Sequence, residues 1–147
     1  MKLQLGRVLA NEKFVLEFDC KEDFSFLEMG DGEHPFGQIS LSGTARSRFG
    51  GVEINALLSA KASVPCARCL RQVDFMIEAP LECLVGAEEE DAEVRLEAGQ
   101  QVDLKAAVIE LLFDEYPSKV LCSPDCRGLC PVCGGNLNDG ACSCESK

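Results

Sequence analysis

The chain has 147 residues, of which 46% are hydrophobic and 27% are charged, so it is long enough for one globular domain and its composition excludes an intrinsically disordered chain. With no Trp and one Tyr, the composition disfavours a large aromatic-lined ligand pocket, and we expect no small-molecule substrate. The net charge of −11 disfavours general attraction to nucleic acid and favours basic partners.

The N-terminal stretch MKLQLGRVLANEKF lacks the continuous apolar run of a signal peptide. No other stretch approaches the roughly 20 apolar residues that a membrane helix requires. We therefore expect a cytoplasmic protein without membrane contact. In a reducing compartment, the ten cysteines favour metal ligands and buried thiols over disulfides.

Alternation of apolar and polar residues predicts antiparallel strands along most of the chain. The first covers residues 14–20, and residues 21–36, which mix acids, Gly and Pro, are expected to form a loop. Further strands follow at about 38–46, 52–64 and 73–85, each with one apolar face. Because Pro80 lacks a backbone donor, the last of these strands should lie at an edge of the sheet or bend there.

An acidic run from Glu88 to Glu93 follows the strands, and we expect a solvated loop there, with an interaction tail or a mimic of a polyanion as the alternative. Apolar residues then recur at helical spacing, which predicts a helix over residues 104–115, capped by Asp103 and stopped by Pro117. Its apolar stripe should pack on the apolar face of the strands.

Six of the ten cysteines lie in residues 121–144, LCSPDCRGLCPVCGGNLNDGACSC. This segment is too polar and Gly-rich to fold by burial, so a tetrahedral Zn²⁺ held by thiolates is expected to replace the missing core. The spacer GGNLNDGA can fold back and bring the CxC pair onto the CxxC pair. The preferred ligands are therefore Cys130, Cys133, Cys142 and Cys144.

Two further cysteine pairs leave a second zinc site open. Cys122 and Cys126 either replace one of the preferred pairs or join Cys66 and Cys69, which lie in the PCARC turn between two strands. One zinc ion is expected, and the eight paired cysteines suffice for two. The remaining cysteines, Cys20 and Cys83, lie at inward strand positions and are expected to pack in the core.

Together these patterns predict an α+β fold: an antiparallel β meander, either open or closed in part into a barrel, with one packed amphipathic helix and a C-terminal Cys-rich zinc knuckle. Residues 1–116 would form the β-rich domain, with the helix near residues 104–115, and residues 117–147 a Cys-rich zinc-binding tail. No enzyme is expected, because the only histidine, His34, lies in an acidic loop and zinc held by four thiolates has no open position for water.

The charge is unevenly distributed along the chain. Residues 36–73 carry five basic residues against one acid, Glu53, a local balance of +4 that could place a basic face on an acidic body. Outward basic residues on a strand pair without a binding role are the alternative. The candidate nucleic-acid-binding residues are Arg46, Arg48, Lys61, Arg68 and Arg71.

Several motifs follow one another along the chain: PCARCL, then VDL opening a helix that ends at Pro117, then CSPDCRGLCPVCGGNLN and CSC. Together, over about residues 62–144, they closely resemble the YceD family of bacterial proteins. The resemblance implies a non-enzymatic factor that supports accumulation or biogenesis of large-subunit (23S) ribosomal RNA. The factor would act as a binding module for large-subunit ribosomal RNA or a precursor ribosome.

Two alternatives to this RNA-binding or pre-ribosome-binding function remain open from the sequence. The acidic body could serve as an adaptor for a basic ribosomal protein, with indirect contact to RNA. The second alternative is a CxxC thiol redox protein, because Arg68 and Arg71 could stabilise thiolates at Cys66 and Cys69.

Overall fold

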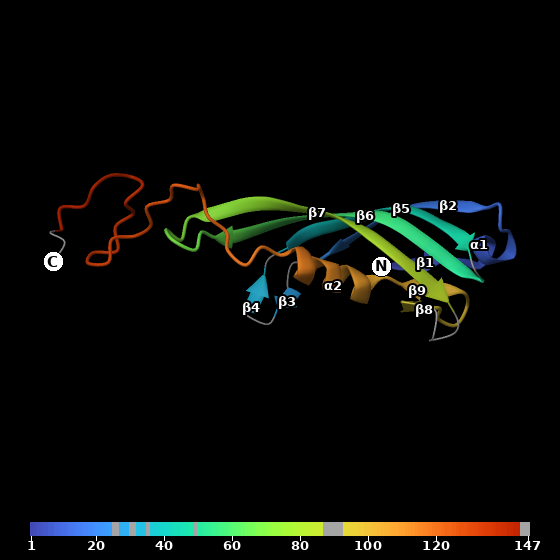
Figure 1. The fold of residues 1–147 in the computed structure, drawn as a ribbon. Coiled ribbons are helices and arrows are strands. Elements are labelled where there is room, and N and C mark those ends of the chain that lie inside the picture. The colour runs from blue at the N-terminus through green and yellow to red at the C-terminus, as the bar shows by residue number, and fades with distance from the viewer. Residues whose placement is uncertain (25–26, 30–31, 35, 49, 87–92, 145–147) are drawn as a thin grey trace.

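A long twisted sheet dominates a computed structural model of the chain, which describes residues 1–24, 27–29, 32–34, 36–48, 50–86 and 93–144. A helix lies on one face of the sheet, and the cysteine-rich segment extends beyond one of its ends (Figure 1). The predicted acidic run lies outside the described residues except for Glu93.

The main sheet has five strands in the order β2-β5-β6-β7-β8. The antiparallel strands are β2 (Val15–Asp23), β5 (Phe36–Arg48), β6 (Gly51–Pro65) and β7 (Gln72–Gly86), and β8 (Val94–Arg95) pairs with β7 in parallel. The predicted meander is confirmed. Among the described residues the edge strands β2 and β8 do not pair with each other, so the sheet is open rather than closed in part into a barrel.

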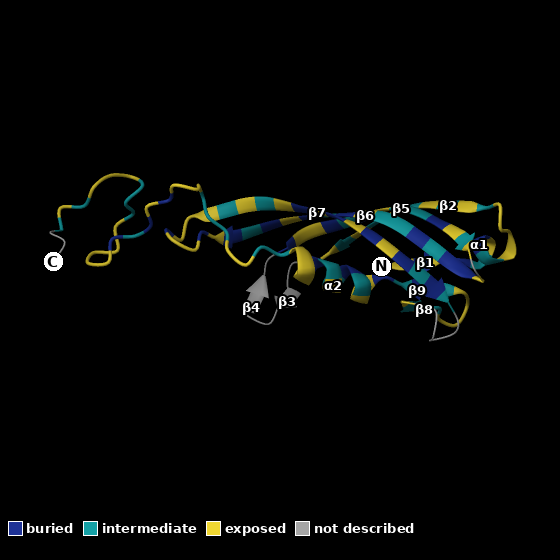
Figure 2. Cartoon of the chain, viewed as in Figure 1, coloured by how far each residue is buried: buried dark blue, intermediate teal, exposed yellow. Residues whose placement is uncertain are grey.

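The period-two pattern of the sequence gives the sheet one buried face. Along β6, for example, Ile54, Leu58 and Ala60 are buried, whereas Leu57 and Lys61 on the opposite face are exposed. Figure 2 shows the same alternation along β7. Pairing with β8 begins only at Val85, so the part of β7 that contains Pro80 is an edge, as its sequence predicts.

The loop predicted over residues 21–36 is wrong in part. Strand β2 continues to Asp23, which lies opposite Gln38 of β5. A short hairpin of β3 (Leu27–Met29) and β4 (Gly32–His34) follows. The hydrophobic pattern did not predict these strands, because acidic residues and glycines interrupt the apolar alternation that marks a half-buried strand.

The N-terminal segment and the helix cover the buried face of the sheet. Strand β1 (Lys2–Gln4) pairs with β9 (Gln101–Asp103), and the short helix α1 (Gly6–Ala10) and the longer helix α2 (Lys105–Glu115) follow these two strands. Val108 and Leu112 of α2 are fully buried in the same core as Ile54 and Leu58, as the apolar stripe predicts. No helix in the described part of the chain has the length and apolar character needed to cross a membrane.

Both ends of α2 lie close to their predicted positions. The N-cap residue is Leu104 rather than Asp103, but the Asp103 carboxylate accepts the backbone N–H of Lys105 at 2.9 Å and so still satisfies a donor of the first turn. The helix ends at Glu115, two residues before Pro117, and Tyr116 is extended because a proline nearby disfavours helical backbone.

Gly43 of β5 sits where the neighbouring strand leaves no room for a side chain. A Cβ at this position would lie 2.2 Å from the backbone oxygen of Asn55 and 2.5 Å from the Cα of Ala56. We expect Gly43→Ala to destabilise the protein by about 2 kcal/mol or more in urea unfolding, because β5 and β6 must separate locally. Gly37→Ala in the same strand is the control, since nothing lies within 4 Å of its Cβ position. Equal stability of both variants would contradict this account.

Candidate metal centres

The first cysteine group begins at the turn between β6 and β7. The backbone N–H of Cys66 donates to the carbonyl of Arg71 at 2.8 Å, and the N–H of Leu70 donates to the carbonyl of Cys66 at 3.0 Å. Leu70 takes a left-handed backbone conformation, with φ of 60°. This tight turn directs the sulfurs of Cys66 and Cys69 into one site.

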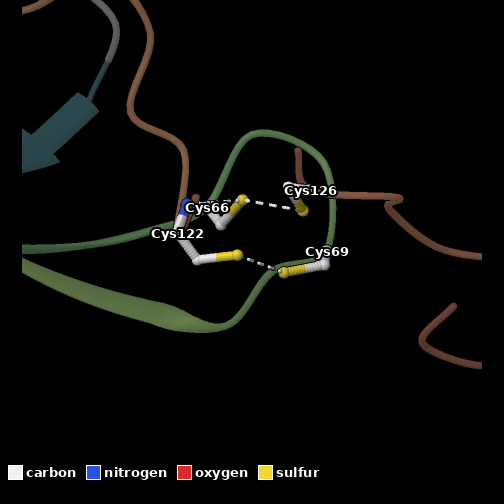
Figure 3. A group of neighbouring side chains, drawn as sticks. All are labelled: Cys66, Cys69, Cys122 and Cys126. Carbon is white, nitrogen blue, oxygen red and sulfur yellow. Dashed lines mark hydrogen bonds between the residues drawn. The ribbon is translucent and has the colours of Figure 1, made fainter. Parts of the chain in front are cut away.

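After α2 the chain returns to this turn and completes the group. The N–H of Ala67 donates to the carbonyl of Val120 at 2.9 Å, which brings Cys122 and Cys126 beside the turn. The Sγ atoms of Cys66 and Cys126 are 3.8 Å apart, and those of Cys69 and Cys122 are 3.5 Å apart (Figure 3). This joins the two pairs in the combination that the sequence left open as a second site.

The second cysteine group lies entirely in the C-terminal segment and holds Cys130, Cys133, Cys142 and Cys144, the set preferred from sequence. The Sγ atoms of Cys142 and Cys130 are 3.3 Å apart. The N–H of Cys130 donates to the carbonyl of Gly135, and the N–H of Gly134 donates to the carbonyl of Cys130. Gly134 has a φ of 71°, so this knuckle turn requires the left-handed backbone that glycine adopts freely.

Both groups have the geometry and donor chemistry of a metal site. Four sulfurs at about 2.3 Å from a tetrahedral ion lie about 3.8 Å from one another. In each group all four sulfurs lie within 4.8 Å of one another, and all ten cysteines of the chain are free. Each group could therefore bind a metal ion, and four thiolates would leave no open position on Zn²⁺.

Within each group the pKa values of two neighbouring thiols are shifted in opposite directions. Burial raises the pKa of Cys66, but N–H donors, including those of Arg68 and Cys122, outweigh it and lower the pKa to about 6. In the same group the pKa of Cys122 is raised to about 12, because its sulfur donates to Cys126 and to Cys69. The second group repeats the contrast: N–H donors of Cys133 and Val132 lower the pKa of Cys130 to about 6, and hydrogen bonding with Cys133 raises the pKa of Cys144 to about 12.

The two groups differ in their surroundings. Cys66, Cys69 and Cys126 are buried and pack with Val73, Leu121 and Leu129, so the first group closes a small core of its own. In the second group only Cys130 is buried. The two cysteines outside these groups lie in the main sheet: Cys83 is buried and Cys20 is half-buried against the core, and burial raises the pKa of both thiols.

The structure does not bring the five candidate nucleic-acid-binding residues together. Arg46 and Arg48 lie near the β5–β6 turn and both pair with Glu53, at 3.3 and 3.0 Å. Arg68 and Arg71 lie in the β6–β7 turn, at the opposite end of the 15-residue strand β6. Such a strand spans about 50 Å, so one continuous basic face does not form.

The other three candidate basic residues also have ion-pair or hydrogen-bond partners within the chain. Lys61 pairs with Asp74 at 3.1 Å, and Arg71 pairs with Asp139 at 2.7 Å. The Arg68 guanidinium donates to the carbonyl of Cys126 at 2.9 Å. Each of these three cations thus has an acceptor within the chain, although all three residues remain exposed.

An acid-rimmed groove lies between α2 and the β7–β8 edge of the sheet, with a volume of about 420 Å³. Buried and half-buried apolar residues form its floor, among them Cys83, Val94 and Leu111. Its rim carries the carboxylates of Glu82, Glu93, Glu110 and Asp114.

Sequence reasoning missed this groove, although one local signal was present. Glu110 and Asp114 are four residues apart and so lie on the same face of the helix. Which side of the sheet this helix face adjoins depends on how α2 packs against β7, and that packing cannot be obtained from spacing alone.

The sequence is similar to several known proteins. Residues 54–147 match the model of a family described as "Large ribosomal RNA subunit accumulation protein YceD". Uncharacterized proteins of Mycobacterium tuberculosis and Mycobacterium bovis are each 32% identical over 91 residues, covering 57% of this chain and 44% of the relative. The chloroplastic "Large ribosomal RNA subunit accumulation protein YCED homolog 1" of Zea mays is 31% identical over 51 residues, covering 34% of this chain and 17% of the relative.

The chain thus spans less than half the length of these curated relatives. No solved structure matches the chain. The region matched by the family model contains both cysteine groups, β7 and α2, whereas the strands before β6 precede it.

Proposed function

Because this chain belongs to the YceD family, named for large ribosomal RNA subunit accumulation, we propose that it is a non-enzymatic factor that supports accumulation of large-subunit (23S) ribosomal RNA. It acts as a binding module for a precursor of the large ribosomal subunit. Its direct contact is with a basic protein of that precursor, so that its effect on the RNA is indirect.

The groove between α2 and β7 supports a basic protein as the direct contact. Within the described part of the chain, Glu82, Glu110 and Asp114 have no ion-pair partner, while Glu93 accepts the backbone N–H of Leu84 at 3.1 Å. An apolar floor with carboxylates around it fits a lysine or arginine side chain, whose aliphatic stem packs while its charge reaches the rim. The net charge of −11 adds long-range attraction to a basic partner.

Direct RNA contact is the second candidate, and one observation favours it. Four exposed cations lie on the segments around the first cysteine group: Arg68, Arg71, Lys119 and Arg127. Opposing this, a zinc ion on four thiolates is a net anion, so these cations would in part balance the centre beside them. The pairing of Arg71 with Asp139 reduces the available charge further.

A thiol redox function has less support from the geometry. Cys66 is 0% exposed and Cys69 is 5% exposed. A thiolate that attacks a disulfide or an oxidant must be reachable from solvent. We therefore propose a structural role for both cysteine groups, with Zn²⁺ as the ion that their sulfur donors fit.

Affinity purification from cells, with and without ribonuclease, tests the protein contact. We expect a basic protein of the large subunit to stay bound to this chain after the RNA has been digested, because carboxylates and not phosphates make the contact. A chain that loses every ribosomal protein on digestion, while still binding purified large-subunit RNA, would instead favour direct RNA contact.

Paired charge reversals locate an RNA contact if one exists. Direct contact at the cysteine end predicts that Arg68→Glu/Arg71→Glu weakens binding to a large-subunit RNA transcript and lowers its salt dependence, since fewer counterions are released. Arg46→Glu/Arg48→Glu at the other end of the sheet is the matched control. We expect the unmodified chain to bind the RNA transcript weakly and neither double variant to change this binding. The metal content of both variants is measured as a control that the cysteine groups are intact.

A further inference from the structure

Asn138 belongs to the second cysteine group by sequence and contacts the first in space. It lies in the spacer between Cys133 and Cys142, yet its side-chain Nδ2 donates to the Sγ of Cys126 at 3.4 Å. Its Oδ1 accepts the backbone N–H of Arg127 at 2.8 Å, next to Cys126 in the chain. One amide group thus contacts both a metal-ligand sulfur of the first group and the backbone beside it.

The orientation of this amide is fixed by its partners. Asn136 Oδ1 accepts both the backbone N–H and the Nδ2 of Asn138, at 3.0 and 2.7 Å. The opposite orientation would point Nδ2 at the N–H of Arg127 and Oδ1 at the sulfur of Cys126 and at Asn136 Oδ1, so donors would meet donors and acceptors would meet acceptors. The Asn138 side chain is therefore set to donate toward the thiolate.

The position of Asn138 depends on the turns that build the second group. The N–H of Leu137 donates to the carbonyl of Gly128 at 2.9 Å, and Leu129 forms a bridge with Asn136. The spacer also begins in the knuckle turn, where the N–H of Cys130 donates to Gly135. Its two ends are held by Cys133 and Cys142, so an ion on the second group would fix the whole spacer.

We propose that Asn138 is a positioning residue that couples metal binding at the two cysteine groups. Metal in the second group orders the spacer and holds the Asn138 amide on Cys126, which strengthens metal binding by the first group. By thermodynamic reciprocity, metal in the first group strengthens the second by the same factor. The inference rests on both groups binding metal, as proposed above, and is independent of any ribosomal partner.

Chelator competition with Zn²⁺ on the full chain measures the coupling. Cys142→Ser/Cys144→Ser leaves only the first group, and Cys66→Ser/Cys69→Ser leaves only the second, so each gives one single-site affinity. The intact chain should bind two ions with an overall constant larger than the product of these two affinities. Outer-shell hydrogen bonds to metal ligands typically contribute about 10- to 100-fold, and we expect an excess of this size.

Substitutions at Asn138 decide whether its amide carries the coupling. Asn138→Ala and Asn138→Asp should both abolish the excess. Asp is the sharper test, because it keeps the acceptor for Arg127 and replaces the donor to Cys126 by a carboxylate oxygen that repels the thiolate. Asp139→Asn is the control, since it removes the ion pair with Arg71 and leaves the amide in place. Absence of an excess in the intact chain, or an excess that survives in Asn138→Asp, overturns the inference.

The same titrations separate this inference from the proposed metal binding. A single-site variant that binds no zinc contradicts the metal role of that group, and with it the basis for coupling. Two functional but independent sites contradict the coupling alone. Substituting Co²⁺ for Zn²⁺ adds a visible absorption signal from each thiolate site, which reports the coordination geometry besides the affinity.

Discussion

Replacing Cys66 by serine should remove one of two zinc ions and release the chain after α2 from the sheet. The Cys66 sulfur is fully buried, lies 3.8 Å from that of Cys126, and accepts the backbone N–H of Cys122 at 3.3 Å. A serine hydroxyl is a poor zinc ligand, and a three-sulfur site would bind the ion far more weakly. Elemental analysis should give about one zinc per chain in place of the two that the cysteine groups can hold.

Proteolysis reports the structural part of the same prediction. Lys119 and Arg127 are exposed trypsin sites on the segment that the first group anchors, and they should be cut faster in Cys66→Ser than in the unmodified chain. Cys20→Ser is the control, since Cys20 belongs to neither group and is half-buried in β2. Two zinc ions and an unchanged cleavage rate in Cys66→Ser would show that the first group is not a metal site.

Reversing two charges on the rim of the groove should abolish capture of the basic partner. Glu110 and Asp114 are exposed, lie one turn apart on α2, and have no ion-pair partner within the described residues. In Glu110→Lys/Asp114→Lys, a cation of the partner would meet two cations, and like charges at close range cost several kcal/mol. We expect at least a tenfold loss of the ribonuclease-resistant partner in quantitative pull-down, which corresponds to about 1.4 kcal/mol.

A second double variant separates local contact from overall charge. Glu12→Lys/Glu17→Lys changes the net charge by the same amount at exposed sites outside the groove. It should slow association somewhat through weaker long-range attraction and leave most of the affinity intact. Equal losses in the two double variants would mean that net charge alone attracts the partner and that the groove is not its binding site.

The sequence predicts the central strands and the helix because burial imposes a period on them. Ile54, Leu58 and Ala60 face the core at alternate positions, and α2 turns Val108 and Leu112 inward at helical spacing. The β3–β4 hairpin carries no such period, and the pairing of β1 with β9 joins residues about 100 positions apart. No local pattern encodes the contact between β1 and β9.

The two cysteine groups show the same contrast. An eight-residue spacer brings Cys133 and Cys142 together, so spacing alone pointed to the second group. The first group joins Cys69 to Cys122 across more than fifty residues, and only the packing of α2 against β7 returns the chain to the turn. Eight paired cysteines are enough for two sites, but only the path of the chain shows that Cys66 and Cys69 meet Cys122 and Cys126.

The pairing of the basic residues was partly accessible from sequence. Strand alternation places Arg46 and Glu53 on the same outward face of the predicted hairpin. A two-residue turn at Gly50 and Gly51 would put Arg46 opposite Asn55, whereas in the structure Arg48 pairs with Gly51 and Arg46 therefore lies opposite Glu53. Contacts from Arg71 to Asp139 and from Arg68 to Cys126 depend on how the C-terminal segment folds back, which no strand register shows.

The uninterrupted pairing of β6 with β7 fixes a distance as well as a fold. From Cys83 beside the groove to Gln72 at the end of β7 next to the cysteine turn, eleven residues of strand span about 36 Å at about 3.3 Å per residue. The β6–β7 pairing runs without a register shift from Val52 to Pro65, so no β-bulge bends these two strands between the groove and the turn. A partner bound in the groove would therefore lie at a fixed distance from the first cysteine group. Any second molecule that contacts this cysteine group would lie at about the same distance from the partner.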